Sequence, residues 1–222
     1  NDGGWLIMGQ AEALRSERDK WQVHLFPGTP IYQKISTLSE AISYPTHLDT
    51  DKTQVLEDTT GQYQQAVEAI RADNPTQAEH HISLLLDNDP KNAKAHILLA
   101  SIFANRQLYP EAMTHIDLAL AESGLYADAH YVKGVIQLEQ KDEDNAIQSF
   151  SASIYCERHH ALSTMMLANI YQQQGDIVKA DRHWRNALKA VEGKAETDYI
   201  SDISDMTVAR LRGMVTEQQK LN

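Results

Sequence analysis

The hydrophobic and polar positions of this chain repeat every 34 residues over most of its length. Alanine returns at this step, a large apolar residue follows each alanine by four positions, and a small residue precedes it by twelve. The positions are Ala78, Ala112, Ala146 and Ala180; Ile82, Ile116, Phe150 and Trp184; and Ala66, Ala100, Gly134 and Ala168. Because small residues let two helices approach closely and the large residue fills the space between pairs, each period predicts a helix, a turn and a second helix.

Four such units follow one another without an insertion between residues 59 and 194. They run over 59–92, 93–126, 127–160 and 161–194. Proline stands where a turn or a helix start is expected, at Pro75 and Pro110 between paired helices and at Pro90 between two units. The pattern therefore predicts an all-α stack of four helix-turn-helix repeats.

Residues 195–222, after the last unit, carry apolar residues at roughly helical spacing. These residues are Ile200, Ile203, Val208, Leu211 and Val215. We expect one closing helix over 195–222 with Thr197 as its N-cap, because the end of a stack of repeats needs a cover with a polar outer side.

Residues 1–58 fall outside the period. Two short runs, 4–9 and 29–35, are apolar or alternate between apolar and polar residues, which is typical of β-strands. They predict a short β-hairpin, which is too small to be an independent domain and is expected to be the remnant of a larger α/β domain. Its open edges also favour pairing with a second copy of the chain, as a homodimer. Residues 37–58 are predicted to be a linker.

The 34-residue unit resembles the tetratricopeptide repeat (TPR) family. The second unit carries the resemblance most clearly, with the family's small, aromatic and alanine positions at Ala100, Tyr109 and Ala112. The resemblance implies a superhelix whose first helices line a concave groove that binds a protein partner.

The same resemblance assigns twelve side chains to the groove, three from the first helix of each unit. They are Tyr63, Val67 and Ile70; Ile97, Ser101 and Asn105; Tyr131, Val135 and Leu138; and Met165, Asn169 and Gln172. Some members of the family hold a C-terminal carboxylate with Lys and Asn at the places occupied here by Tyr63, Val67, Ile97 and Ser101, so that this clamp is missing. Apolar and aromatic side chains with amide edges favour a peptide or an amphipathic helix, since apolar burial gives affinity and amides fix the register.

Residues 1–36 are similar to the C-terminal end of the CheR-type chemotaxis receptor methyltransferases. The similarity rests on the glycine-bounded strand over 3–9, on Glu12, and on a later strand that contains Tyr32 and Lys34. It implies that the repeats are an interaction module appended to a protein-glutamate methyltransferase that uses S-adenosylmethionine. The partner would then be a chemoreceptor or another signalling protein in the cytoplasm.

The alternative is a free-standing repeat protein, an adaptor or chaperone of a pilus or secretion assembly. In that case residues 1–36 would fold against the repeats.

Composition narrows these functions further. With 20 Lys and Arg against 31 Asp and Glu, the net charge is −11 and no block of basic residues stands out, which disfavours nucleic acid as a partner. No apolar run is long enough to span a bilayer. The chain does not begin with methionine, and we expect it to be part of a longer protein.

The residues that could carry chemistry favour structural roles. The ten histidines show no metal-binding motif, and several recur at the same place in successive repeats. Cys156 is the single cysteine, which excludes an internal disulfide. The glycines never form the spacing of a cofactor-binding loop. We therefore expect this chain to have no catalytic residue, no metal and no cofactor of its own. S-adenosylmethionine would be the cofactor of the methyltransferase to which the repeats are appended.

The chain on its own should not transfer a methyl group, because the residues that would bind S-adenosylmethionine lie outside it. The measurement is a transfer assay with labelled S-adenosylmethionine and chemoreceptor cytoplasmic domains as acceptors. Turnover by the isolated chain would contradict this prediction.

Overall fold

The computed structural model describes residues 5–7, 21–26, 29–34 and 50–221, with side chains from residue 59 to residue 218. The chain divides into two units, residues 1–48 and residues 49–222, which are described separately.

The N-terminal part, residues 1–48, contains a three-stranded antiparallel sheet of β1 (Trp5–Ile7), β2 (Trp21–Phe26) and β3 (Thr29–Lys34). β3 is the central strand, so that Tyr32 pairs with Leu6 of β1 on one side and with Val23 of β2 on the other. Both strands expected from the sequence are present and paired. The element is nevertheless a three-stranded sheet and not a hairpin of two strands, since β2 was missed although its residues alternate between apolar and polar.

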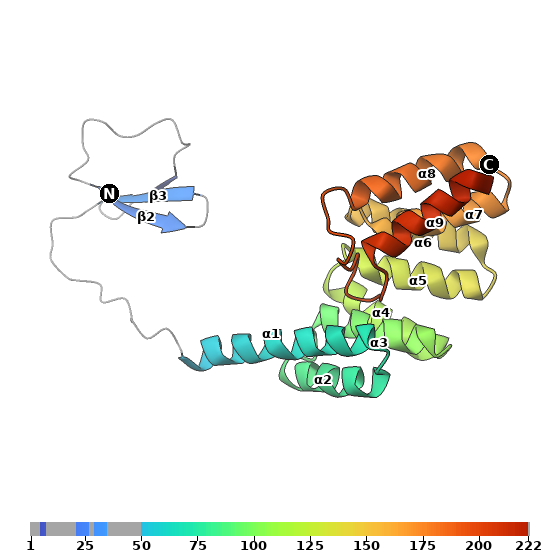
Figure 1. Ribbon diagram of the computed structural model, residues 1–222. Helices are drawn as coiled ribbons and strands as arrows, with labels where there is room; N and C mark the ends of the chain where they lie inside the picture. Colours follow the sequence, from blue (N-terminus) through green and yellow to red (C-terminus); the bar gives the residue numbers. More distant parts are fainter. Residues whose placement is uncertain (1–4, 8–20, 27–28, 35–49, 222) are drawn as a thin grey trace. The chain divides into compact units, whose positions relative to one another are not determined.

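Residues 50–221 form nine α-helices (Figure 1). They are α1 (Thr50–Arg71), α2 (Pro75–Asn88), α3 (Ala93–Asn105), α4 (Tyr109–Glu122), α5 (Ala127–Glu139), α6 (Glu143–Cys156), α7 (Ala161–Gln173), α8 (Ile177–Ala190) and α9 (Val208–Leu221). The first eight pair as hairpins that stack in chain order, and α9 contacts α8. The predicted class, four helix-turn-helix repeats with a closing helix, is confirmed. In the described part of the chain, no helix combines the length and the hydropathy needed to cross a membrane.

The first helix extends further toward the N-terminus than the period indicates. α1 begins at Thr50, within the segment 37–58 that the sequence predicts to be a linker. Residues 37–49 of that segment lie outside the described residues.

The core is made of the positions that define the period. The four repeated alanines are fully buried, as are Ile82, Ile116 and Phe150, while Trp184 is 2% exposed. The third unit has glycine where the others have alanine, and the reason is its phenylalanine. A Cβ on Gly134 would lie 2.7 Å from a ring carbon of Phe150, so the backbone of α5 and this ring occupy all the space between the two helices.

The turn inside each helix pair has the same backbone conformation in all four repeats. One residue in each turn has a positive φ, and these residues recur at the step of the period. They are Asp73 (53°), Gln107 (61°), Lys141 (63°) and Gly175 (79°). Only glycine adopts this conformation without a steric penalty, so the first three turns are held in place by the packing of their helices.

The closing helix begins later than the sequence predicts. Residues 195–207, called the return loop below, are not part of α9, and Thr207 rather than Thr197 caps the helix by accepting a hydrogen bond from the backbone N–H of Arg210 at 3.3 Å. Within the loop, side-chain oxygens of Asp198, Ser201 and Ser204 accept hydrogen bonds from nearby backbone N–H groups. Such bonds compete with helix formation, which explains the delayed start.

Gly134→Ala should destabilise the protein by about 1–3 kcal/mol, because the added methyl group overpacks the contact with the buried Phe150 ring. Gly213→Ala in α9 is the matched control: nothing lies within 4 Å of its Cβ position, so the gain in helix propensity should add about 0.5–1 kcal/mol. Urea denaturation of both variants gives the two values. Equal stability of the variants would contradict the close approach of α5 and α6.

Candidate functional site: the concave groove

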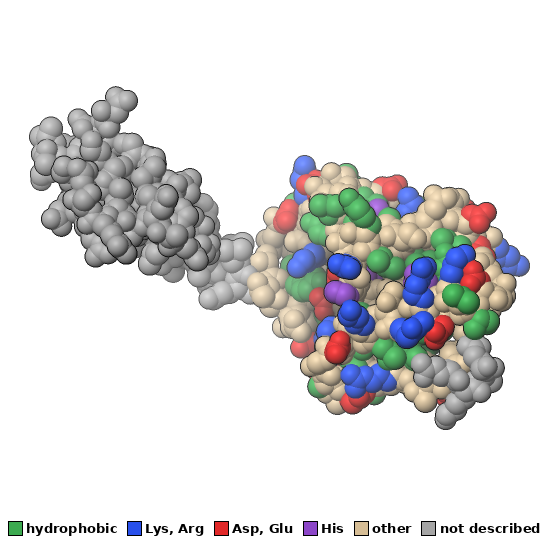
Figure 2. Space-filling model, turned by 90° about the horizontal axis from the view of Figure 1, so that it is seen from above, with side chains coloured by type: hydrophobic (Ala, Val, Ile, Leu, Met, Phe, Trp, Pro, Cys, Tyr) green, Lys and Arg blue, Asp and Glu red, His purple; other side chains and the backbone are tan. Residues whose placement is uncertain are grey.

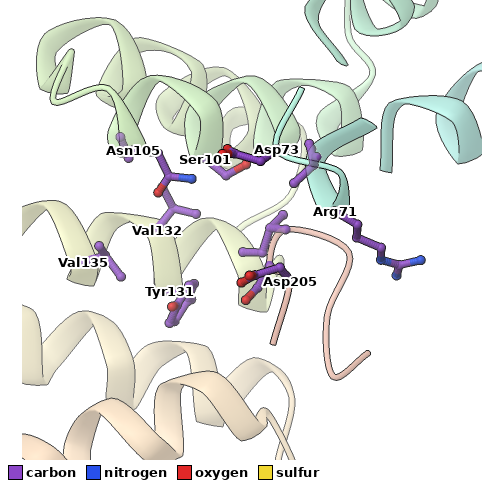
Figure 3. A pocket seen from close by; sticks show the side chains of 12 residues that line it. Arg71, Asp73, Ser101, Asn105, Tyr131, Val132, Val135 and Asp205 are labelled. Atoms are coloured by element: carbon purple, nitrogen blue, oxygen red, sulfur yellow. The ribbon is translucent and has the colours of Figure 1, made fainter. Parts of the chain in front are cut away.

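The predicted groove residues lie on α1, α3, α5 and α7, the first helices of the four pairs. Five of them line one cavity of about 390 Å³ between α1, α3 and α5. They are Ile70, Ser101, Asn105, Tyr131 and Val135. Figure 3 shows Val132 of α5 below Asn105 of α3, with Ser101 on the same helix as Asn105 and with Tyr131 and Val135 on the same helix as Val132. The cavity has valine side chains from α5, a hydroxyl and an amide from α3, and the charged side chains of Arg71, Asp73 and Asp205, so it can hold a short apolar side chain beside a hydrogen-bonded backbone.

Tyr63 and Ile97 line a second cavity of about 360 Å³. Lys94 of α3 lies over the ring of Tyr63, with its Nζ atom 5.7 Å from the ring centroid. The return loop separates the two cavities, because Ile203 lines both of them and is itself 6% exposed.

Five predicted groove residues lie away from these cavities. Val67 and Met165 are buried in the core, Leu138 packs against a second cluster of buried residues, and Asn169 is half-buried. Gln172 accepts a hydrogen bond from the indole N–H of Trp184 at 3.1 Å and donates one to Gln218. The inner side of the fourth unit is thus in contact with α8 and α9 of the chain itself.

The return loop joins the two ends of the stack of repeats. The hydroxyl of Tyr63 donates a hydrogen bond of 3.0 Å to Oδ2 of Asp202, and Nη2 of Arg71 donates one of 3.1 Å to Oδ1 of the same carboxylate. These partners are 139 and 131 residues apart in the sequence. The guanidinium of Arg71 also lies 4.3 Å from the centroid of the Tyr199 ring, a cation–π contact.

A second polar contact holds the loop to α5. The hydroxyl of Ser201 donates a hydrogen bond of 3.2 Å to Oδ1 of Asp128, and Nε2 of His160 lies 3.0 Å from the same oxygen. Asp128 of α5 therefore connects His160, the N-cap residue of α7, with the return loop.

The chemistry of the Asp202 contacts is set by burial. Burial and, next, the negative charge of Asp202 raise the pKa of Tyr63 above its usual value, so that its hydroxyl keeps the proton that it donates. Nε of Arg71 is buried without a hydrogen-bond partner. The site therefore offers a hydroxyl and a guanidinium to one carboxylate and retains one unused N–H donor.

The histidines serve mainly as packing and hydrogen-bonding groups inside the repeats. Nδ1 of His96 lies 3.0 Å from Nδ1 of His115, and Nδ1 of His81 lies 2.8 Å from Oε1 of Gln62 at the equivalent place one repeat earlier.

Burial raises the pKa of the Cys156 thiol. Within the described residues, no group of three or more His, Cys, Asp or Glu side chains could hold a metal ion.

A basic surface escaped the sequence analysis. Figure 2 shows several Lys and Arg side chains on the face seen from above. Helix α8 carries four exposed basic residues, Lys179, Arg182, Arg185 and Lys189. Two of the four have acidic partners on α8 or at its N-cap, Lys179 with Asp176 and Arg185 with Asp181. Spacings of three and four residues on one helix were the available signal, because they place side chains on the same face.

A model of the tetratricopeptide repeat family matches residues 63–127. The solved structure of PilF from Pseudomonas aeruginosa is similar to this one with a TM-score of 0.55 and 18% identity, over 74% of this chain and 70% of that chain. The fold is a tetratricopeptide repeat superhelix. At this identity the likeness to PilF shows the fold alone.

Two other solved structures are less similar. MamA has a TM-score of 0.49 and 18% identity, over 71% of this chain and 98% of that chain. PilW, described as a widely conserved type IV pilus biogenesis factor, has a TM-score of 0.35 and 18% identity, over 74% of this chain and 93% of that chain. No curated protein gives a significant match. None of these comparisons supports the resemblance of residues 1–36 to CheR-type methyltransferases.

The TPR superhelix should lose stability as the pH falls below about 6.5, the usual pKa of histidine. Burial and then the neighbouring His96 lower the pKa of His115 in the folded state, so the unfolded chain binds this proton more readily. His115→Asn should therefore reduce the loss of unfolding free energy between pH 7.5 and pH 5.5, measured by urea denaturation. His80→Asn, on the exposed side of α2, is the control, and an unchanged pH dependence in His115→Asn would refute the assignment.

Proposed function

We propose that this chain is a protein-interaction adaptor that binds an extended segment of a partner protein in its concave groove. The observation that carries the proposal is the return loop: a segment of the chain already lies in the groove, as a turn with Ile203 buried and Asp202 hydrogen-bonded. A cavity remains on each side of this loop. A groove with apolar walls and a few fixed polar groups suits a peptide, because burial supplies affinity and hydrogen bonds fix the register.

Of the two functions expected from the sequence, we favour the adaptor or chaperone of a pilus or secretion assembly. The likeness of the fold to PilF supports this choice. Such an adaptor acts by holding partner segments and needs no catalytic group of its own.

The second candidate is an interaction module appended to a methyltransferase. It is favoured by one observation: the two strands that carry this resemblance, β1 and β3, pair directly, with Leu6 opposite Tyr32. The cofactor S-adenosylmethionine, a chemoreceptor partner and a cytoplasmic location belong to this candidate.

The groove is tested best at a residue that lines the open cavity; because Val135 also packs against the second cluster of buried residues, circular dichroism checks that its variant folds. Val135 is half-buried on the wall of the larger cavity, whereas Met165 is 5% exposed and its truncation would also weaken the fold. Val135→Arg places a charge against a bound apolar side chain and should reduce retention of groove partners at least tenfold, a change of about 1.4 kcal/mol. Val178→Arg on α8, where the side chain is 81% exposed, is the matched control.

Both variants and the unaltered chain are used as bait in lysate of the source cells, with quantitative mass spectrometry of the retained proteins. Groove partners are those that the unaltered chain and Val178→Arg retain and Val135→Arg loses. Equal retention by all three baits would refute binding in the groove. Pilus or secretion components among the partners support the favoured function, and chemoreceptors support the second candidate.

A further inference from the structure

The return loop shows which chemistry the groove recognises. Two adjacent residues of the loop enter it: Asp202 places its carboxylate between the Tyr63 hydroxyl and the Arg71 guanidinium, and Ile203 is buried between the two cavities. The carboxylate therefore has a built receptor with two donors, and the aliphatic side chain has an apolar one. An acidic residue followed directly by a large aliphatic residue is the pattern that fits both.

The receptor for the carboxylate includes two cations, Arg71 and Lys94, although the chain has a net charge of −11 and Asp128 lies nearby. The Tyr63 ring has the Lys94 ammonium 5.7 Å from its centroid, while its hydroxyl shares the Asp202 carboxylate with Arg71. Arg71 keeps a buried Nε–H without a partner, so a carboxylate or backbone carbonyl in a slightly different position would gain a hydrogen bond that Asp202 does not make.

The return loop holds its own shape independently of its contacts with the groove. Its ends are joined outside the Asp202 contacts, by the bridge between Tyr199 and Thr207 and by the hydrogen bond of 3.0 Å from the Ile200 N–H to the Met206 carbonyl. Its tip is attached to the groove by side chains, and the anchoring carboxylate of Asp202 is 47% exposed. A half-exposed ion pair contributes little stability, so a partner with the same two groups can compete for the site.

We propose that the partner presents an acidic residue followed directly by a large aliphatic residue, and that it binds by displacing Asp202 and Ile203 of the return loop. This inference rests on the proposed function. The loop then acts as an internal ligand that keeps the groove closed to segments without the acidic and aliphatic pair. Only segments that match both groups replace it.

The test uses a fluorescent peptide with the sequence of residues 197–207 and the full chain. In the loop variant, Asp202→Asn with Ile203→Ser, the loop no longer fits its own receptor. The peptide should bind this variant at least tenfold more tightly than the unaltered chain, measured by fluorescence anisotropy. A peptide that itself carries Asn and Ser at these two positions should not bind.

Two further variants locate the bound peptide. Adding Arg71→Gln to the loop variant should abolish binding, because the guanidinium that holds the carboxylate is lost. Glu196→Gln is the matched control: this carboxylate belongs to the same loop, lines neither cavity and pairs with Arg212, so the variant should bind the peptide as weakly as the unaltered chain. Asp202→Asn alone, which keeps the shape of the side chain, serves if the double variant fails to fold by circular dichroism.

Equal affinity of the peptide for the unaltered chain and the loop variant would overturn the proposal, as would the absence of binding to a folded loop variant. Neither result bears on the proposed function, since the Val135→Arg bait experiment tests binding in the groove independently. If partners found there are lost from Val135→Arg but not displaced by the peptide, the groove binds partners by another pattern and the inference fails while the proposed function stands.

Discussion

The structure depends on one packing constraint, the contact between a small residue of the first helix and a large residue of the second helix in each repeat. The third unit shows how tight this contact is, because a Cβ on Gly134 would overlap the ring of Phe150. In the fourth unit the same two positions hold Ala168 and Trp184. Because interiors are packed as densely as crystals, this contact fixes the separation of the helices and thereby the stacking of successive pairs. The concave surface formed by α1, α3, α5 and α7 follows from that stacking.

A stack of repeats has contacts only between neighbours, so nothing in the repeats themselves links the first unit to the last. Here the return loop makes that link, through Asp202 to Tyr63 and Arg71 of α1 and through Ser201 to Asp128 of α5. The side chains that a solenoid of this fold presents to a partner thus hold a segment of the same chain. The same contacts link the two ends of the superhelix and fill part of the groove. The binding of a partner is therefore coupled to the position of the loop.

Local charge differs from overall charge in this protein. The net charge of −11 predicts repulsion of anionic partners, yet Arg71 and Lys94 flank the receptor for a carboxylate, and α8 presents four exposed basic side chains. Electrostatic attraction acts over about a Debye length, so that a few cations on one surface decide the local potential whatever the remainder of the chain carries.

The sequence by itself determined the four repeats, the helix pairs and the buried positions, because these depend on contacts within 34 residues that recur four times. It also placed seven of the twelve expected groove residues around the two cavities. It did not find β2, the late start of α9, the basic face of α8 or the return loop in the groove. The contacts of Asp202 span 131 and 139 residues, and no periodicity relates their partners. Only the tertiary structure, which brings the ends of the superhelix within reach of one loop, decided which side chains of the groove are open and which are occupied.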